Sequence, residues 1–145
     1  YVATLVSGGE HYAAHLLKSV KSYDNSRLIY NYGEEPINDM NISDSTMAAV
    51  TKGMHDLTHD SLTSAFSRCM VEAGAKTGSA QVGTDIANGV FVAYAPYDDP
   101  EIAVAIVVEK GGSGSLLANA AVDIINAWFS RGSSSVTTGE NTLLQ

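Results

Sequence analysis

Residues 89–110, GVFVAYAPYDDPEIAVAIVVEK, decide the fold that we expect for this chain. Two runs rich in Val, Ile, Phe and Tyr flank the segment 97–101, which contains two aspartates and a proline. β-Branched and aromatic side chains favour the pleated surface of a sheet, whereas Asp and Pro favour a tight turn. The stretch therefore predicts two antiparallel strands joined by a short turn.

The segment after this hairpin predicts a helix that lies on the sheet. Three glycines within residues 111–114 lead into residues 115–129, where apolar side chains recur at helical spacing. One stripe has four members and a second stripe runs beside it: Leu116, Ala120, Ile124 and Trp128, then Leu117, Ala121 and Ile125. A stripe this wide needs a sheet to cover, and Arg131 and Gly132 end the helix.

The residues before the hairpin predict further elements. We expect a helix over residues 1–7 that ends at Gly8 and Gly9, a hairpin of residues 15–20 and 27–32 around a turn at 24–26, a helix from Ser43 or Asp44 to His59, and a strand over residues 75–82. Residues 61–70 indicate a turn or a short helix, because their helical spacing is brief and rich in hydroxyls.

The composition narrows the classes of protein. The chain has 145 residues, of which 45% are hydrophobic, and this predicts one folded unit. Sixteen acidic residues against eight Lys and Arg give a net charge of -8, and the basic residues do not cluster, so we expect no nucleic-acid partner. No apolar run reaches the roughly 18 residues of a membrane span. A single Cys69 excludes an internal disulfide.

The predicted strand before the hairpin carries the triplet Lys76-Thr77-Gly78, followed by Ser79. The segment lacks the glycine that a phosphate-binding loop places directly before its lysine, since Ala75 stands there. An edge strand with exposed hydroxyls and a solubilising lysine would also explain the triplet alone. Its place after a helix-rich segment and before an apolar hairpin favours a functional strand.

In this context the chain resembles the C-terminal part of the transpeptidase domain of class B penicillin-binding proteins. The segments AGAKTGSAQ (73–81) and GVFVAYAPYDDPEIAVAIVVEKGG (89–112), then the amphipathic helix, follow the order typical of that family, and YVATLVSGGEHYAAHLLKSV (1–20) resembles the segment upstream. The resemblance implies an α+β fold, an antiparallel sheet flanked by helices, as part of a β-lactamase/transpeptidase-like domain. It covers residues 1–131, and we expect residues 132–145 to form a polar tail.

The same resemblance implies a peptidoglycan D,D-transpeptidase that works through a serine acyl-enzyme and binds β-lactams. The family signature combines S-x-x-K, an S-x-N element and K-T-G. Only the third is present, because no serine in this chain has lysine three positions later. The YDN sequence at residues 23–25 we interpret as a turn. We therefore expect an inactive fragment, which in its whole protein is extracytoplasmic and held at the membrane by an N-terminal segment absent from this chain.

The site residues follow from the same resemblance. Lys76 and the backbone N–H of Ser79, as half of an oxyanion hole, would be catalytic. Lys76, Thr77, Gly78 and Ser79 would bind substrate: the hydroxyls reach its carboxylate, and Gly78 lets an extended peptide approach the strand. The family more often has threonine at the Ser79 position and glycine at the Ala75 position. We expect no cofactor.

Two other patterns have a structural and a chemical interpretation. His55 and His59, with Asp56, resemble the zinc-binding H-E-x-x-H pattern, but aspartate is shorter and no third ligand is evident. We expect these histidines on a solvated helix face without metal, and a metallohydrolase stays as an alternative. The EKGGSGS segment (109–115) could bind an anion at a helix start, but a tight strand-to-helix connection is the preferred interpretation.

The expected partners are a peptidoglycan stem peptide, β-lactams and the remainder of the transpeptidase domain. A noncatalytic module that binds a peptide or a partner through the same edge strand is the alternative function. A piece cut from a larger domain also exposes apolar surface, which makes a homo-oligomer possible.

Overall fold

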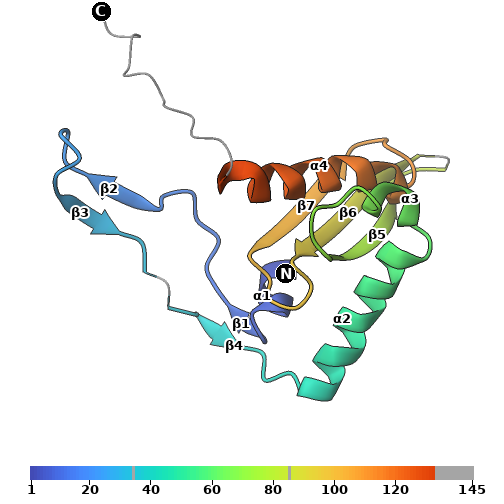
Figure 1. The fold of residues 1–145 in the computed structure, drawn as a ribbon, viewed down its shortest axis with the longest axis horizontal. Coiled ribbons are helices and arrows are strands. Elements are labelled where there is room, and N and C mark those ends of the chain that lie inside the picture. Colours follow the sequence, from blue (N-terminus) through green and yellow to red (C-terminus); the bar gives the residue numbers. More distant parts are fainter. Residues whose placement is uncertain (34, 85, 133–145) are drawn as a thin grey trace, which may run out of the picture. The chain divides into compact units, whose positions relative to one another are not determined.

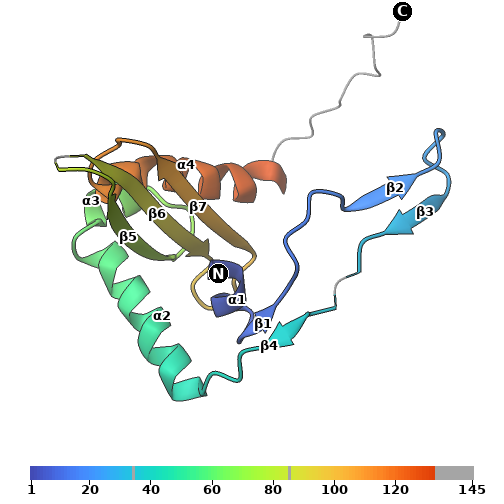
Figure 2. The ribbon, with the colours of Figure 1, turned by 180° about the vertical axis from the view of Figure 1, so that it is seen from behind.

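The computed structural model describes residues 1–33, 35–84 and 86–132 (Figures 1 and 2). They form two compact units, one from Tyr1 to Val50 and one from Thr51 onward. The predicted tail, apart from Gly132, lies outside the described residues. No helix of the described part is long and apolar enough to cross a membrane.

The first unit contains one short helix and two small antiparallel pairs. Helix α1 (Val2–Val6) ends before Gly8 and Gly9, which have φ of 78° and 105°, as the sequence predicts. Strands β2 (Ser19–Lys21) and β3 (Leu28–Asn31) form the predicted hairpin, although β2 begins four residues later than expected. Strands β1 (Glu10–His11) and β4 (Asn38–Asp39) pair as well, which the sequence did not predict because each has only two residues.

The turn of this hairpin is held by the side chain of Asp24. Its carboxylate accepts hydrogen bonds from the hydroxyls of Ser22 (2.6 Å) and Ser26 (2.7 Å), and Asn25 adopts φ of 58°. These bonds, the one from Ser22 foremost, lower the pKa of Asp24 to about 2. The interpretation of residues 23–25 as a turn is therefore confirmed.

Helix α2 (Asp44–His59) begins and ends where the sequence predicts. The hydroxyl of Ser43 accepts a hydrogen bond from the backbone N–H of Thr46 (3.3 Å), as an N-cap does. A single short helix, α3 (Thr63–Phe66), follows it.

The second unit is built on a three-stranded antiparallel sheet in the order β5-β6-β7. Its strands are β5 (Gly74–Gln81), β6 (Ala87–Ala95) and β7 (Ile102–Val108), which confirms the predicted hairpin and the strand before it. One face packs against α3 and α4 (Ala118–Phe129), and this α+β arrangement agrees with the expected fold class. The core between these layers contains, among others, Leu62, Ala65, Ala75, Phe91, Ala93, Val104, Ala121 and Ile125.

The buried face of α4 differs from the first predicted stripe. The buried positions are Ala118, Ala121, Val122 and Ile125, whereas Leu116, Ile124 and Trp128 are 72%, 44% and 37% exposed. Leu116 belongs to a 3-10 turn, η1 (Gly114–Leu117), so it does not share the helical phase of α4. The small side chains at 118 and 121 let the helix axis approach the sheet, which explains why the second stripe is the one that packs.

Candidate functional site

The four predicted site residues are consecutive on β5, the edge strand of the sheet. β5 pairs with β6 along one side, where Lys76 lies opposite Val92 and Ser79 opposite Gly89. Among the described residues no strand pairs with its other side. Figures 1 and 2 show β5 at the margin of the sheet. That side can accept an added strand, because the backbone groups of an edge strand are unpaired.

Exposure changes along β5. Gly74 and Ala75 are buried, Thr77 and Gly78 are half-buried, and Lys76 and Ser79 are exposed. Because side chains alternate along a strand, Thr77 and Ser79 share the face of Ala75, which packs in the core with α4, and Lys76 lies on the opposite face. The Lys76 ammonium donates a hydrogen bond to the carbonyl of Thr77 (2.6 Å). The motif therefore begins where the strand leaves the core.

A close backbone contact supports the middle of this strand from inside the unit. An ideal Cβ on the buried Gly114 would lie 2.2 Å from the carbonyl oxygen of Val90 and 2.4 Å from that of Gly78. Gly114 has no positive φ, so its need for glycine comes from this contact. The glycines of this loop predict a tight strand-to-helix connection, but no local pattern in the sequence signals the contact of Gly114 with the strands.

The same loop makes the predicted strand-to-helix connection. Gly112 has φ of 71° and donates its backbone N–H to the carbonyl of Ala87 (3.0 Å). The hydroxyl of Ser113 accepts from the backbone N–H of Ser115 (3.4 Å) at the start of η1. These bonds agree with the interpretation of the loop as a strand-to-helix connection.

The start of β5 is packed against an aromatic side chain. A Cβ on Gly74 would lie 2.4 Å from the ring of Tyr94, which is fully buried. The Tyr94 hydroxyl has no hydrogen-bond partner among the described residues. Burial raises the pKa of Tyr94 to about 12. The contact fixes the strand where it enters the sheet.

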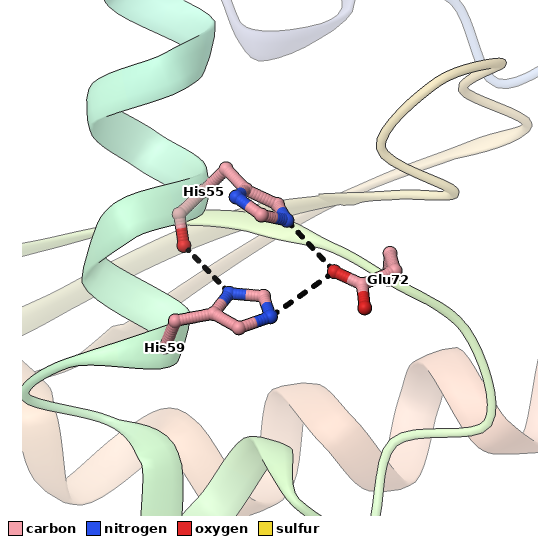
Figure 3. A group of neighbouring side chains, drawn as sticks. All are labelled: His55, His59 and Glu72. Carbon is pink, nitrogen blue, oxygen red and sulfur yellow. Dashed lines mark hydrogen bonds and ion pairs between the residues drawn. The ribbon is translucent and has the colours of Figure 1, made fainter.

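A separate cluster joins two histidines of α2 to a carboxylate (Figure 3). Nε2 of His55 lies 2.7 Å and Nε2 of His59 lies 3.2 Å from Oε2 of Glu72, in the segment between α3 and β5. The hydrogen bond from His55 is the main cause that lowers the pKa of Glu72. The sequence does not signal this third group, because twelve residues, with α3 among them, lie between His59 and Glu72. Asp56 is not in the cluster and pairs with Lys52 (2.5 Å).

Comparisons with known proteins identify the family and agree with the fold. The model of the family described as "Penicillin binding protein transpeptidase domain" matches residues 1–126. Penicillin-binding protein 2B of Streptococcus pneumoniae is 33% identical over 146 residues, covering 88% of this chain and 21% of that protein. Penicillin-binding protein 2A of Bacillus subtilis is 29% identical over 123 residues, covering 74% and 17%.

Solved structures give the same result. The structure of penicillin-binding protein 2B from S. pneumoniae strain R6 superposes with a TM-score of 0.73 at 30% identity, over 88% of this chain and 23% of that one. Penicillin-binding protein A from M. tuberculosis, solved as an imipenem acyl-enzyme complex, gives 0.71 at 27% identity, over 88% and 28%. The chain therefore spans about a fifth of the length of the S. pneumoniae relative.

Proposed function

The chain belongs to the penicillin-binding protein transpeptidase domain family, as a region of a class B member, and from this we propose that it supplies the substrate-binding strand of a peptidoglycan D,D-transpeptidase. The complete enzyme works through a serine acyl-enzyme, and residues 1–131 are the C-terminal portion of its catalytic domain. The nucleophilic serine and its S-x-x-K lysine come from residues outside this chain.

The observation that carries this proposal is the outer edge of β5, with which no strand pairs among the described residues. An extended stem peptide can pair with that edge through its backbone, which fixes its register without large side chains. The half-buried Gly78 has no Cβ to obstruct the peptide, and the exposed Ser79 and half-buried Thr77 carry hydroxyls for the substrate carboxylate.

Lys76 and Ser79 have separate roles in this proposal. The Lys76 ammonium is exposed on the other face of the strand from Thr77 and Ser79, and it adds positive charge near the edge where the peptide would lie, in a chain whose net charge is -8. The backbone N–H of Ser79 is one donor of the oxyanion hole, and the N–H of the nucleophilic serine is the other. Both donors stabilise the charge that develops on the carbonyl oxygen during acylation and deacylation.

The same geometry would bind β-lactams, which carry a carboxylate and an acylating carbonyl. An imipenem acyl-enzyme of the M. tuberculosis relative supports this ligand class. The other partner is the remainder of the transpeptidase domain. The whole protein is extracytoplasmic, with an N-terminal membrane anchor outside this chain.

Acylation of the full-length protein by a fluorescent penicillin tests the role of Lys76. The variant Lys76→Ala should be acylated about 10- to 100-fold more slowly, since a hydrogen bond to a charged group contributes roughly 1.5–3 kcal/mol. The variant Lys21→Ala, which removes an exposed lysine from the first unit, is the matched control and should react at the wild-type rate. Equal rates for Lys76→Ala and the wild type would refute the role of the strand.

A second experiment tests where the nucleophile lies. The isolated chain of residues 1–145 should stay unlabelled under conditions that label the full-length protein. Covalent labelling of the isolated chain would contradict the proposed division of roles. A coding sequence without S-x-x-K and S-x-N upstream of Tyr1 would instead favour a noncatalytic module that binds peptides through the same edge.

A further inference from the structure

We propose that His55, His59 and Glu72 form a binding site for a divalent transition metal ion, best suited to zinc, apart from the transpeptidase motif. The three ligand atoms, two imidazole nitrogens and one carboxylate oxygen, all lie within 4.8 Å of one another. It is the one such group of three in the described part of the chain. The inference goes beyond the proposed function and does not depend on it.

The helix and the loop bring these ligands together. His55 and His59 are four residues apart on α2, so their rings lie on one face with centroids 4.2 Å apart. Glu72 reaches them from the segment that enters β5, and its backbone carbonyl accepts a hydrogen bond from the N–H of Tyr97 (2.9 Å). In Figure 3 both rings direct a nitrogen toward the carboxylate. Helix α2 therefore holds the two histidines, and the backbone hydrogen bond to Tyr97 holds the segment that carries Glu72.

The distances are close to those of a zinc site. Zinc bonds to nitrogen and oxygen of roughly 2.0–2.2 Å place tetrahedral ligands about 3.3–3.5 Å apart. The Glu72 oxygen is 2.7 Å and 3.2 Å from the two nitrogens. Side-chain rotations that move these atoms by about 1 Å would therefore seat the ion.

A hydrogen bond of His59 and a ring contact of His55 orient the two imidazoles for metal binding. Nδ1 of His59 is 3.2 Å from the carbonyl oxygen of His55, to which an Nδ1–H donates. That bond leaves Nε2 as the nitrogen whose lone pair faces Glu72, as in many metal-bound histidines. The ring of Tyr97 packs on His55 with centroids 4.2 Å apart and limits its rotation.

The donor set and the surroundings indicate the class of metal. Two imidazoles and one carboxylate favour zinc and similar first-row ions over magnesium and calcium, which take oxygen ligands. The side chains of His55, His59 and Glu72 are 25%, 52% and 61% exposed, so an ion can enter. A pocket of ≈ 370 Å³ lined in part by His59 and Glu72 leaves room for water as a fourth ligand.

Such an ion would link α2 to the segment that leads into the Lys-Thr-Gly strand. Glu72 lies two residues before Gly74, where β5 begins. The hydroxyl of Thr58 on α2 already donates to the carbonyl of Ala73 (3.1 Å), so the metal would strengthen an existing connection. We therefore assign the ion a structural role in holding the start of β5.

Zinc titration of the full-length protein, purified without a polyhistidine tag and in competition with a chromophoric chelator, tests the site. The variants Glu72→Gln and His59→Asn should lower the affinity for one zinc ion per chain by at least about 100-fold. Loss of a residue that only hydrogen-bonds to a metal ligand already lowers the metal affinity roughly 10- to 100-fold. The control His15→Asn, whose ring stacks on Tyr32, should bind as the wild type does. Equal zinc affinity and stoichiometry in Glu72→Gln and the wild type would overturn the proposal.

Cobalt provides a readout that does not depend on how the variants fold. Cobalt added to the wild-type protein should give the visible absorption bands of a four- or five-coordinate ion, and an excess of zinc should remove them. Penicillin acylation at the wild-type rate would show that Glu72→Gln is folded. A wild-type protein that binds neither zinc nor cobalt would also overturn the proposal.

Discussion

Replacement of Gly114 by alanine should both destabilise the second unit and displace the Lys-Thr-Gly strand. The added Cβ would lie 2.2 Å and 2.4 Å from the carbonyl oxygens of Val90 and Gly78, where real Cβ atoms keep at least 3.0 Å. Both oxygens belong to the paired strands β5 and β6, so they cannot move without weakening the ladder. Overpacking costs roughly 1–3 kcal/mol, and contacts with backbone favour the upper end. We expect a loss of about 3 kcal/mol.

Urea denaturation of the chain measures this loss, with Gly53→Ala as the matched control. Gly53 is exposed on α2 with no atom within 4 Å of an ideal Cβ, so alanine there should stabilise the helix by about 0.5–1 kcal/mol. In the full-length protein, penicillin acylation should slow in Gly114→Ala and not in Gly53→Ala. An unfolding midpoint of Gly114→Ala equal to that of the wild type would refute the steric argument.

Three further predictions concern single side chains. The variant Tyr94→Phe removes a buried hydroxyl without a partner among the described residues, so the free energy of unfolding should stay equal or rise by about 1 kcal/mol, and a clear loss would reveal a missed partner. An NMR titration of the Asp24 carboxyl should have its midpoint at pH about 2 and not at 3.8. The folded-state pKa of Asp24 is lower than its unfolded-state pKa. The ionised carboxylate therefore stabilises the hairpin fully above the unfolded-state pKa, and this stabilisation is lost as the pH falls toward 2. The side chain of Asn126 makes hydrogen bonds to the backbone N–H of Met70 and the backbone carbonyl of Arg68, so Asn126→Ala should lower the free energy of unfolding, measured in urea, by about 1–3 kcal/mol. Asp123→Ala breaks only an exposed ion pair and should cost less. A larger loss in Asp123→Ala than in Asn126→Ala would contradict this expectation.

The sequence predicts elements whose signal is local. Alternation and turn residues located β5, β6 and β7, and the cap at Ser43 located the start of α2. The face of α4 was predicted only in part, because the apolar pattern continues from η1 into α4 while the helical phase does not. The apolar pattern of residues 114–129, taken as one helix, does not reveal the change from a 3-10 turn to an α-helix at Ala118.

Contacts between distant residues were beyond the reach of such patterns. Glu72 comes near His55 only because α3 turns the chain back past α2, and Gly114 contacts Gly78 only because the loop after β7 returns over the sheet. No spacing of residues in the sequence indicates that Glu72 or Gly114 makes these contacts. The functional role of the Lys-Thr-Gly strand was inferred through the family resemblance, since a lysine and hydroxyl side chains are equally typical of an exposed edge strand without a function.

The packing around β5 also explains how an open edge can be specific. A strand that binds a peptide through its backbone loses affinity if its own backbone must first be ordered. Here the start of β5 is fixed by Tyr94 against Gly74, and its middle by Gly114 against Gly78. Both contacts come from the rest of the unit and leave the outer edge without a paired strand among the described residues. The exposed charge of Lys76 discourages pairing with apolar strands of other chains, and in the proposed function it would attract a peptide that ends in a carboxylate.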